Sequence, residues 1–369
     1  MKILDVNFFW RQSLGLCALL GAMALPAAAR DITDALGRTV EVPDKVERII
    51  CSGPGCLRFL TYLGAQDMAV AVDAIEKRPP GAAPRAYAIA HPELRDLPLF
   101  GEHRGRDNPE LILALDPAPQ VILKTLSSIG VGHDDLSNQT GLPVVAIDPG
   151  DLAGQREALD AALRIMGATV GRDARAEEVI AFFDSEIEEL AARAARSGAE
   201  APGVYVGGVA FQGAQGFTGT EPFYPPFDLL GLKNLARTGA PGNSRHSVVA
   251  REQIVDWDPE ILFLDLGTVR GEDVGGLHEL RTDAAYRGLT AVAEGEVWGV
   301  LPNTLYHVEL GSVLANAWFI GSVTRPDAFG DVDPVAKAKE IESFLVGKPV
   351  FDTFNAAYGK MVFQHVPVE

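Results

Sequence analysis

One short pattern occurs once in each half of the chain, and it constrains the fold more than any other feature of the sequence. Both copies place a glutamate, an isoleucine and an Asp-Pro pair at the same offsets, directly before a β-rich run. The matching residues are Glu110, Ile112, Asp116 and Pro117 in the first copy and Glu252, Ile254, Asp258 and Pro259 in the second. A chain built in this way is expected to form two similar lobes with a ligand site in the cleft between them.

Short β-rich runs alternate with helical periodicity around both copies, which predicts an α/β fold with parallel or mixed sheets flanked by helices. Strands are expected at residues 48–51, 69–72, 121–124, 144–147, 203–207, 261–265 and 297–301. Helices are expected at residues 56–63, 109–115, 134–140 and 308–319. A further helical stretch runs from 152 to 195, where Gly167 and Gly171 predict a break into two helices. Its second part, 173–195, carries an apolar stripe and is a candidate spine between the lobes.

The first thirty residues have the pattern of an export signal. Lys2 and Arg11 precede an apolar run at 14–25, and small residues follow at 27–29. The run is about half of the roughly 20 residues that a membrane-spanning helix needs, so a cleaved signal peptide is expected rather than an anchor. The predicted division is a signal peptide at 1–29, a first lobe at 30–150, a helical linker at 151–197 and a second lobe at 198–369.

Charge and cysteine content exclude several classes of protein. The chain has 32 Lys and Arg against 50 Asp and Glu, a formal net charge of −18, which disfavours a nucleic-acid surface because Lys and Arg bind the phosphates. Three cysteines form no disulfide framework. Cys51 and Cys56 are interpreted as two buried thiols, with a disulfide as the alternative that an oxidising compartment permits.

No motif of a known enzyme class is found. The chain lacks a G-x-S-x-G elbow, a Walker loop, H-E-x-x-H and C-x-x-C, and its 7 histidines are scattered without the spacing of a metal cluster. We therefore expect a binding protein with no cofactor of its own. A secreted metalloenzyme is the rival class, and it would need a nucleophile–base pair or a closed metal site.

Candidate ligand-binding residues lie in loops that follow predicted strands, where α/β folds place ligand groups. Arg104 and Arg106 in G-E-H-R-G-R-D offer guanidinium groups for a carboxylate, although a solvated loop explains them equally well. The loop from 207 to 224 is rich in glycine and aromatic residues and is expected either to cover a ligand or to pack into its own lobe. The complete set of candidates is Arg104, Arg106, His133, Phe217, Tyr224, Asn303, Tyr306 and His307.

Four segments resemble a known family. The segments D-I-T-D-A-L-G-R-T-V-E-V-P at 31–43, V-E-R-I-I-C-S-G-P-G at 46–55, N-P-E-L-I-L-A-L-D-P at 108–117 and V-A-R-E-Q-I-V-D-W-D-P at 249–259 are similar to those of periplasmic iron-complex-type substrate-binding proteins of ABC importers. The resemblance implies two α/β lobes bridged by a long helix, the class III architecture. It also implies a monomeric periplasmic receptor that carries a ferric siderophore, haem or cobalamin.

The resemblance further assigns Glu110 and Glu252 to the lobe tips, where they would dock on basic pockets of an inner-membrane permease. Their alternative role is to stabilise a helix N-terminus. A ferric siderophore or a similar metal chelate is the expected ligand, because no His-rich constellation for a bare ion is evident. Haem, a corrinoid and a directly bound metal ion are the alternatives, and the metal and its donor atoms are not specified by the sequence.

Overall fold

The computed structural model describes residues 29–79, 84–126, 129–198, 200–211, 213–238, 240, 244–269 and 274–368. The predicted signal peptide therefore lies outside the described residues, apart from Ala29. No helix among the described residues combines the length and the apolar character needed to cross a membrane.

The first half is built on a six-stranded sheet in the order β6-β5-β4-β3-β7-β8. Its strands are β3 (Ile49–Ser52), β4 (Ala69–Asp73), β5 (Leu99–Glu102), β6 (Arg106–Asp107), β7 (Val121–Thr125) and β8 (Val144–Ile147). All neighbouring pairs are parallel except β5 and β6, which form a hairpin. The strands β1 (Ala29–Thr33) and β2 (Thr39–Pro43) form a separate antiparallel ribbon.

Helices cover both faces of this sheet because successive residues of each strand point to opposite sides. Ile49, Leu123 and Val145 point into the main core, whereas Ile50 and Ile122 point into a second apolar cluster. The helices of this half are α1 (Cys56–Tyr62), α2 (Ala86–Ala90), α3 (Pro109–Leu113) and α4 (His133–Thr140). Because α3 and α4 contribute Ile112 and Leu136 to the second cluster, they cover the face opposite α1.

The second half is built on a four-stranded parallel sheet in the order β11-β9-β13-β14. Its strands are β9 (Gly203–Gly207), β11 (Lys233–Asn234), β13 (Ile261–Asp265) and β14 (Val297–Val300), and β10 (Gly219–Thr220) pairs separately with β12 (Ser247–Val248). Its helices are α7 (Pro225–Leu230), α8 (Arg251–Trp257), α9 (Gly276–Thr282), α10 (Ala284–Arg287), α11 (Thr290–Glu294), α12 (Leu310–Thr324), α13 (Pro326–Phe329), α14 (Pro334–Val346) and α15 (Phe351–Ala357).

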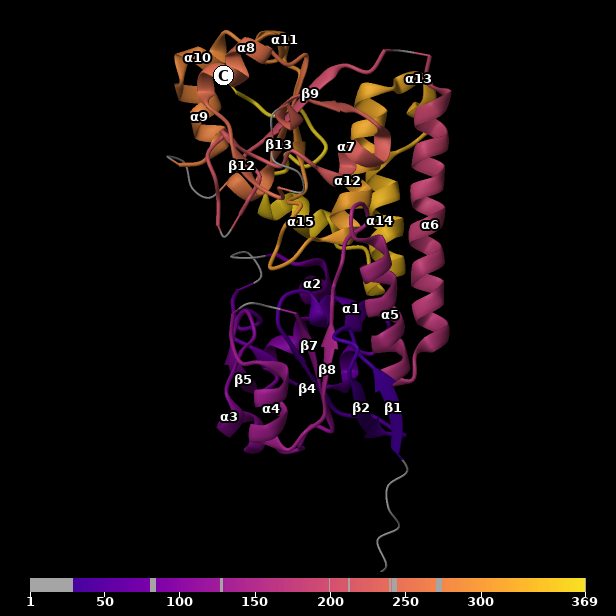
Figure 1. Cartoon of the computed structure of the whole chain (residues 1–369). Helices are drawn as coiled ribbons and strands as arrows, with labels where there is room; N and C mark the ends of the chain where they lie inside the picture. The colour runs from indigo at the N-terminus through magenta and orange to yellow at the C-terminus, as the bar shows by residue number, and fades with distance from the viewer. Residues whose placement is uncertain are drawn as a thin grey trace, which may run out of the picture.

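Two long helices connect the halves, α5 (Arg156–Val170) and α6 (Asp173–Arg196), and α6 runs along the side of the whole molecule (Figure 1). Near its start, Arg175 donates to the Tyr62 carbonyl of the first half at 3.0 Å. Near its end, Arg193 pairs with Asp331 of the second half at 2.6 Å. The predicted spine between the lobes is therefore confirmed as a bridging helix.

Only one of the two glycines predicted to break the linker does so. Gly171 has a φ of 68° and ends α5, whereas Gly167 lies inside α5. A Cβ on Gly167 would lie 2.8 Å from the Ala176 Cβ of α6. Gly167 is thus explained by the close packing of α5 against α6 rather than by a break.

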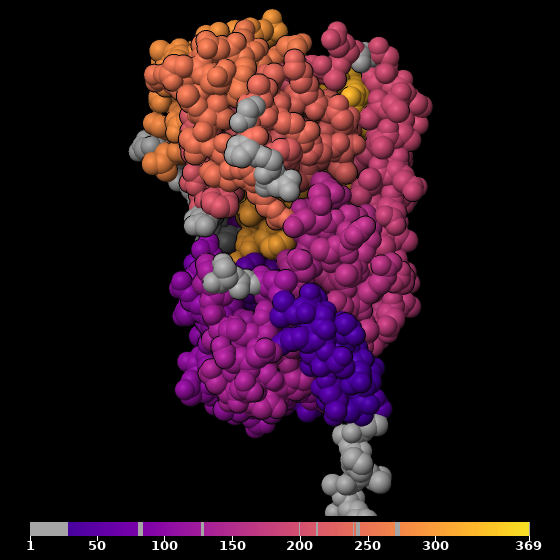
Figure 2. Space-filling view, in the orientation of Figure 1, coloured from indigo at the N-terminus to yellow at the C-terminus, as the bar shows by residue number. Residues whose placement is uncertain are grey.

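The two halves share one continuous core, in which apolar side chains of α1, α5, α6, α12 and α14 take part. The last helices reach back to the first half, since α14 packs against α1 and α2 (Figure 1). The surface remains hollowed on one side where the halves meet (Figure 2). A bridging helix and a shared core thus join the two halves on either side of this hollow.

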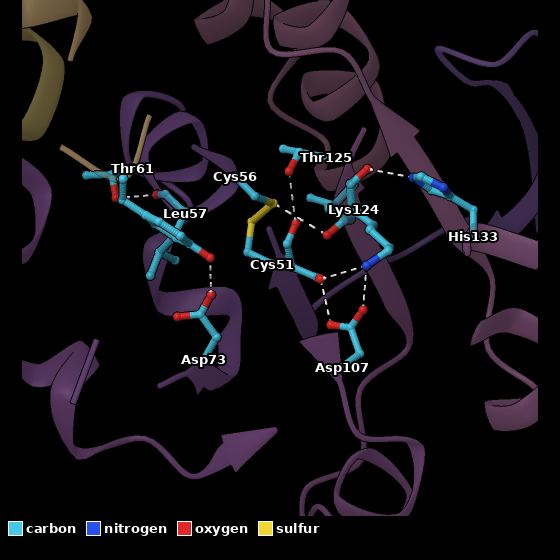
Figure 3. Close-up of a disulfide and its surroundings, with 12 residues drawn as sticks. Cys51, Cys56, Leu57, Thr61, Asp73, Asp107, Lys124, Thr125 and His133 are labelled. Atoms are coloured by element: carbon cyan, nitrogen blue, oxygen red, sulfur yellow. Dashed lines mark hydrogen bonds and ion pairs between the residues drawn. A yellow bond between two sulfur atoms is a disulfide. The ribbon is translucent and has the colours of Figure 1, made fainter. Parts of the chain in front are cut away.

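The interpretation of Cys51 and Cys56 as buried free thiols is wrong. The structure joins them in a disulfide between the end of β3 and the first turn of α1 (Figure 3). Their Cα atoms are 5.4 Å apart, which is within the ordinary range for disulfides. The intervening Gly53 and Gly55 both have a φ of 87°, a region that favours glycine, and this turn allows the short loop to close.

Candidate ligand-binding site

A cavity of about 490 Å³ lies between the two halves. Its first wall consists of residues from the loop after β4 and from the β5–β6 hairpin: Ile75, Arg78, Arg85, His103 and Arg104. Its second wall consists of residues from loops that follow β9, β13 and β14: Ala210, Phe211, Gly213, Gly267, Thr304, Leu305 and Tyr306. Both walls are thus formed at the carboxyl ends of parallel strands, where ligands bind in open α/β sheets.

The first wall is cationic. Arg78, Arg85 and Arg104 line the cavity, and none of the described residues that line it is acidic. Arg85 is paired with Glu76 at 2.8 Å, whereas the guanidinium groups of Arg78 and Arg104 have no ion pair within the described part of the chain. Burial, together with the nearby charges of Arg78 and Arg104, lowers the pKa of His103. The site therefore offers an anionic ligand two guanidinium groups that no described acid neutralises and a neutral imidazole.

The second wall is largely apolar and carries an exposed aromatic ring. Ala210, Gly213 and Gly267 present little or no side chain to the cavity, and Phe211 exposes 43% of its surface. The Phe211 ring stacks on the His246 imidazole at 4.7 Å between centroids, with 6° between the ring planes. Burial lowers the pKa of His246, so this stack is uncharged near neutral pH. Such a wall fits an apolar or planar portion of a ligand.

Tyr306 joins the two walls. Its hydroxyl donates to the Asp73 carboxylate at 2.6 Å and accepts from the Arg104 backbone N–H at 2.7 Å. Tyr306 and Arg104 are both non-glycine residues at positive φ, 69° and 65°, a conformation that persists only where the surroundings hold it. Burial raises the pKa of Asp73 to about 7. Tyr306 belongs to the second half, whereas Asp73 and Arg104 belong to the first. These two hydrogen bonds therefore help to set the position of one half relative to the other.

The loop that carries Tyr306 is held from below by a buried arginine of α1. Arg58 is 1% exposed and donates to the carbonyls of Leu305 at 2.8 Å and Val308 at 2.9 Å. It also forms an ion pair with Glu309, itself 1% exposed, at 3.0 Å. Arg58 of the first half thereby holds residues on both sides of Tyr306 in the loop of the second half that lines the cavity.

A cluster of buried acids lies behind the second wall. Asn303 donates to the Glu221 carboxylate at 2.7 Å through its side chain and to Asp265 at 3.1 Å through its backbone. Burial raises the pKa of Glu221 to about 8 and that of Asp265 to about 7. No cation is within salt-bridge distance of either carboxylate among the residues described, so both are stabilised in their protonated forms.

This cluster predicts a specific pH dependence of stability. The folded state binds the Glu221 proton more tightly than the unfolded chain, whose carboxyl titrates near 4.5. The stability that this tighter proton binding gives the folded state is therefore lost as pH rises from about 4.5 to 8. E221Q does not titrate and keeps an acceptor for Asn303. We expect the free energy of unfolding of E221Q, measured in urea, to exceed that of the wild type by an amount that grows by on the order of 1–3 kcal/mol between pH 5 and 8.5.

The exposed Glu188→Gln variant on α6 serves as the control, and its difference from the wild type should stay constant with pH. A pH-independent difference for E221Q would contradict the assignment of a raised pKa to Glu221.

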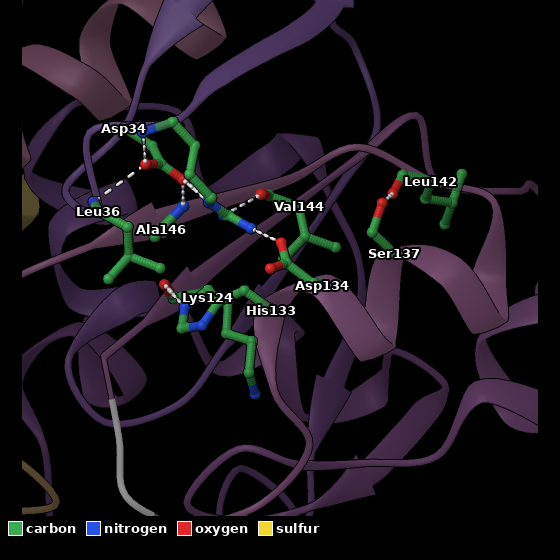
Figure 4. Close-up of polar contacts among 10 residues, drawn as sticks. Asp34, Leu36, Lys124, His133, Asp134, Ser137, Leu142, Val144 and Ala146 are labelled. Carbon is green, nitrogen blue, oxygen red and sulfur yellow. Dashed lines mark hydrogen bonds and ion pairs between the residues drawn. The ribbon is translucent and has the colours of Figure 1, made fainter.

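Of the residues predicted from the sequence, the structure brings Arg104 and Tyr306 together in the cavity. Arg106 is exposed on β6 and does not line the cavity. His133 begins α4, where its Nε2 lies 3.2 Å from the Lys124 carbonyl (Figure 4), and it does not line the cavity. Neither residue is placed where it would contact a ligand in this cavity.

The remaining candidates lie behind the second wall. Phe217 and Tyr224 are fully buried in the core of the second half. Asn303 belongs to the acid cluster described above. His307 packs on Gly55, and burial together with Arg58 lowers its pKa to about 3. The glycine- and aromatic-rich loop therefore contributes Phe211 to the cavity, while Phe217 packs inward.

Sequence reasoning did not select Asp73, Arg78, Arg85 or Phe211 as site residues. Asp73 ends β4, and Arg78 and Arg85 follow it closely in the chain. Their position after a buried strand was the available signal, because strand ends face the cleft in such folds. No group of three or more His, Cys, Asp or Glu side chains suited to a metal ion is found among the described residues.

This geometry, a ligand cavity between two α/β halves bridged by a long helix, is that of a class III binding protein. Residues 49–303 match the family model described as "Periplasmic binding protein", so the chain belongs to that family. The family consists of solute-binding proteins of ABC transporters rather than enzymes.

Solved structures share the fold. A periplasmic solute-binding protein from Veillonella parvula DSM 2008 superposes with a TM-score of 0.71 at 18% identity, covering 93% of this chain and 100% of the other. The molybdate-binding protein MolA from Haemophilus influenzae gives 0.67 at 17% identity, covering 87% and 98%. The heme-binding protein HmuT gives 0.53 at 19% identity, covering 85% and 96%. No curated protein sequence matched the chain.

Proposed function

We propose that this protein is the periplasmic receptor of an ABC importer for an anionic metal chelate, with a ferric siderophore as the expected ligand. The single observation that supports this most is a cavity with three arginines on one wall, two of them without an ion pair to any described residue, in a chain with a net charge of −18. A cleft lined by one sign of charge focuses the electrostatic field and raises the local concentration of oppositely charged ligands.

The size of the cavity favours a chelate over a small ion. About 490 Å³ lies within the range of small-molecule sites, roughly 300–1,000 Å³. A bare metal ion or a small oxyanion would leave most of that volume to water. The apolar second wall would contact the organic part of a chelate, while the arginines bind its carboxylates or other anionic oxygens.

Haem is the second candidate, because the exposed Phe211 ring on the apolar wall suits a macrocycle and the arginines suit its two carboxylates. A corrinoid lacks that complementary negative charge and is less favoured by the same observation. A directly ligated metal ion has no donor cluster among the described residues to support it.

The test is calorimetric titration of the protein with ferric chelates of carboxylate, catecholate and hydroxamate type, with haemin, with cobalamin and with free divalent metals. Tryptophan fluorescence is less suitable because no tryptophan lines the cavity. We expect an anionic chelate to bind with submicromolar affinity that decreases with rising salt. R104A should weaken binding of the chelate about tenfold or more. Arg106 lies just beyond Gly105 but does not line the cavity, so R106A should bind the chelate as the wild type does. Binding of free metal alone would contradict the proposal.

A further inference from the structure

A buried lysine lies directly behind the cationic wall. Lys124 ends in an ammonium group near the Cys51–Cys56 disulfide, and the residue is only 1% exposed (Figure 3). A lysine is rarely buried to this extent without partners, because desolvating its charge is costly. Lys124 Nζ has three oxygen partners, the Asp107 carboxylate, the Gly105 carbonyl at 3.0 Å and the Ser52 hydroxyl at 3.3 Å.

Two of these partners belong to the β5–β6 hairpin. Gly105 is in its turn, and Asp107 is in β6. The Asp107 carboxylate also accepts from the Ser52 hydroxyl at 2.6 Å, so the cluster ties the hairpin to the end of β3. The cluster therefore fixes the hairpin to two central strands of the sheet, β3 and β7.

The same hairpin presents Arg104 to the cavity. Arg104 and Gly105 follow one another at φ values of 65° and 72°, and Tyr306 holds the Arg104 N–H from the opposite side. Behind the turn, the Gly105 carbonyl accepts from Lys124 and from the Val131 backbone N–H at 3.1 Å, and in front of the turn Tyr306 accepts from the Arg104 N–H. A strained turn keeps its geometry only when its surroundings determine it in this way.

We propose that Lys124 is a positioning residue that sets the place of the Arg104 guanidinium for ligand binding, an inference that rests on the proposed function. Lys124 does not reach the cavity and contacts no ligand. Its effect acts through the Gly105 carbonyl and Asp107, which determine where the turn lies. A buried ion pair contributes little net stability compared with an apolar pair of similar volume, so stability alone does not account for it.

The variant that tests this role is K124M/D107N, because it removes both buried charges together, leaves neither one unpaired, and keeps an acceptor for the Ser52 hydroxyl. We expect its unfolding midpoint in urea to stay near that of the wild type. Its affinity for the two carboxylate-bearing probes, ferric citrate and haemin, should fall about tenfold, as measured by calorimetry. In an R104A background the same pair of substitutions should produce no further loss, because both act on one interaction.

The matched control is K337M/E186Q, which removes another partly buried Lys–carboxylate pair between α14 and α6, outside the cavity lining. It should leave both affinities unchanged. Unchanged affinity in K124M/D107N, or losses that simply add to that of R104A, would overturn the positioning role while leaving the proposed function intact. If the wild type binds neither carboxylate probe, the same comparison is made with the anionic ferric chelate that it does bind, and failure of the wild type to bind any anionic chelate would overturn both.

If K124M/D107N does not fold, G130A provides the second test. A Cβ on Gly130 would lie 1.9 Å from the Gly105 carbonyl oxygen, so the hairpin turn and the segment at Gly130 must move apart although the Lys124–Asp107 pair is retained. We expect the same two probes to bind about tenfold more weakly to G130A. Wild-type affinity in that variant would show that the place of the hairpin does not control binding.

Discussion

Replacing Arg58 with methionine is expected to lower the free energy of unfolding by about 3–5 kcal/mol, which is a large part of the stability of a typical domain. The substitution leaves the Glu309 carboxylate buried without its cation, and the carbonyls of Leu305 and Val308 lose their donor. Because these groups lie between α1 and the loop that carries Tyr306, the loss affects the contact between the two halves.

Urea unfolding monitored by circular dichroism measures this effect. The double variant R58M/E309Q removes the unpaired charge and keeps an acceptor for the Tyr62 hydroxyl, so it should recover a substantial part of the loss. The exposed pair of Lys45 and Glu47 provides a surface comparison, where K45M should change stability by less than about 1 kcal/mol. A loss of less than 1 kcal/mol in R58M would mean that the Arg58 contacts do not hold the halves together.

Removing both tip glutamates is expected to abolish transport while leaving ligand affinity unchanged. In each copy of the repeated unit the isoleucine is buried, Ile112 at 1% and Ile254 at 0%, while the glutamate two residues earlier is exposed. The helices that carry them, α3 and α8, lie at opposite ends of the molecule (Figure 1). We propose that a permease with two basic pockets binds these two carboxylates.

The two tips are not equivalent. Glu252 is already paired with Arg251 at 3.0 Å, whereas Glu110 has no ion pair within the described part of the chain. Each tip also exposes an aliphatic side chain three positions after its glutamate, Leu113 at 61% and Val255 at 38%. We therefore expect E110A alone to weaken docking more than E252A, and R251A to strengthen it, because R251A frees the second carboxylate.

Vesicles that contain the reconstituted permease and ATP, supplied with ligand-loaded protein, measure the transport defect of E110A/E252A. Calorimetry with the best chelate checks that binding is retained. The control E157A/E188A makes the same change of net charge on exposed positions of α5 and α6, away from both tips. Transport by E110A/E252A at the rate of the control would refute docking through these two residues, and lost ligand affinity would point to a structural role.

Much of the fold could be predicted because its strands and helices have local patterns. The predicted strands at 144–147, 203–207 and 261–265 have the observed bounds, and the other predicted strands agree within about one residue of theirs. The bridging helix was predicted at 173–195 and observed at Asp173–Arg196. Buried parallel strands read as continuous apolar runs, and an amphipathic helix repeats its apolar residues every three or four positions. These signals depend only on near neighbours in the chain.

The site was predicted less well. Arg104 and Arg106 are equivalent in sequence, but only Arg104 lines the cavity, because the tight turn at Gly105 directs the two residues differently. Phe211 and Phe217 lie in the same aromatic loop, yet one lines the cavity and the other packs on Tyr205 and Tyr286 in the core. The disulfide also depends on the geometry of a glycine turn that residue spacing alone does not reveal.

By itself the sequence determined the class of fold, the repeated unit and the chemistry available in the loops, since these follow from local periodicity and residue type. Only the tertiary structure decided which loop residues meet. Arg78, Arg104 and Tyr306 are distant in the chain and share a cavity because the carboxyl ends of strands from both halves face each other there. Such contacts join residues far apart in sequence, and no local pattern encodes which side of a turn faces the partner half.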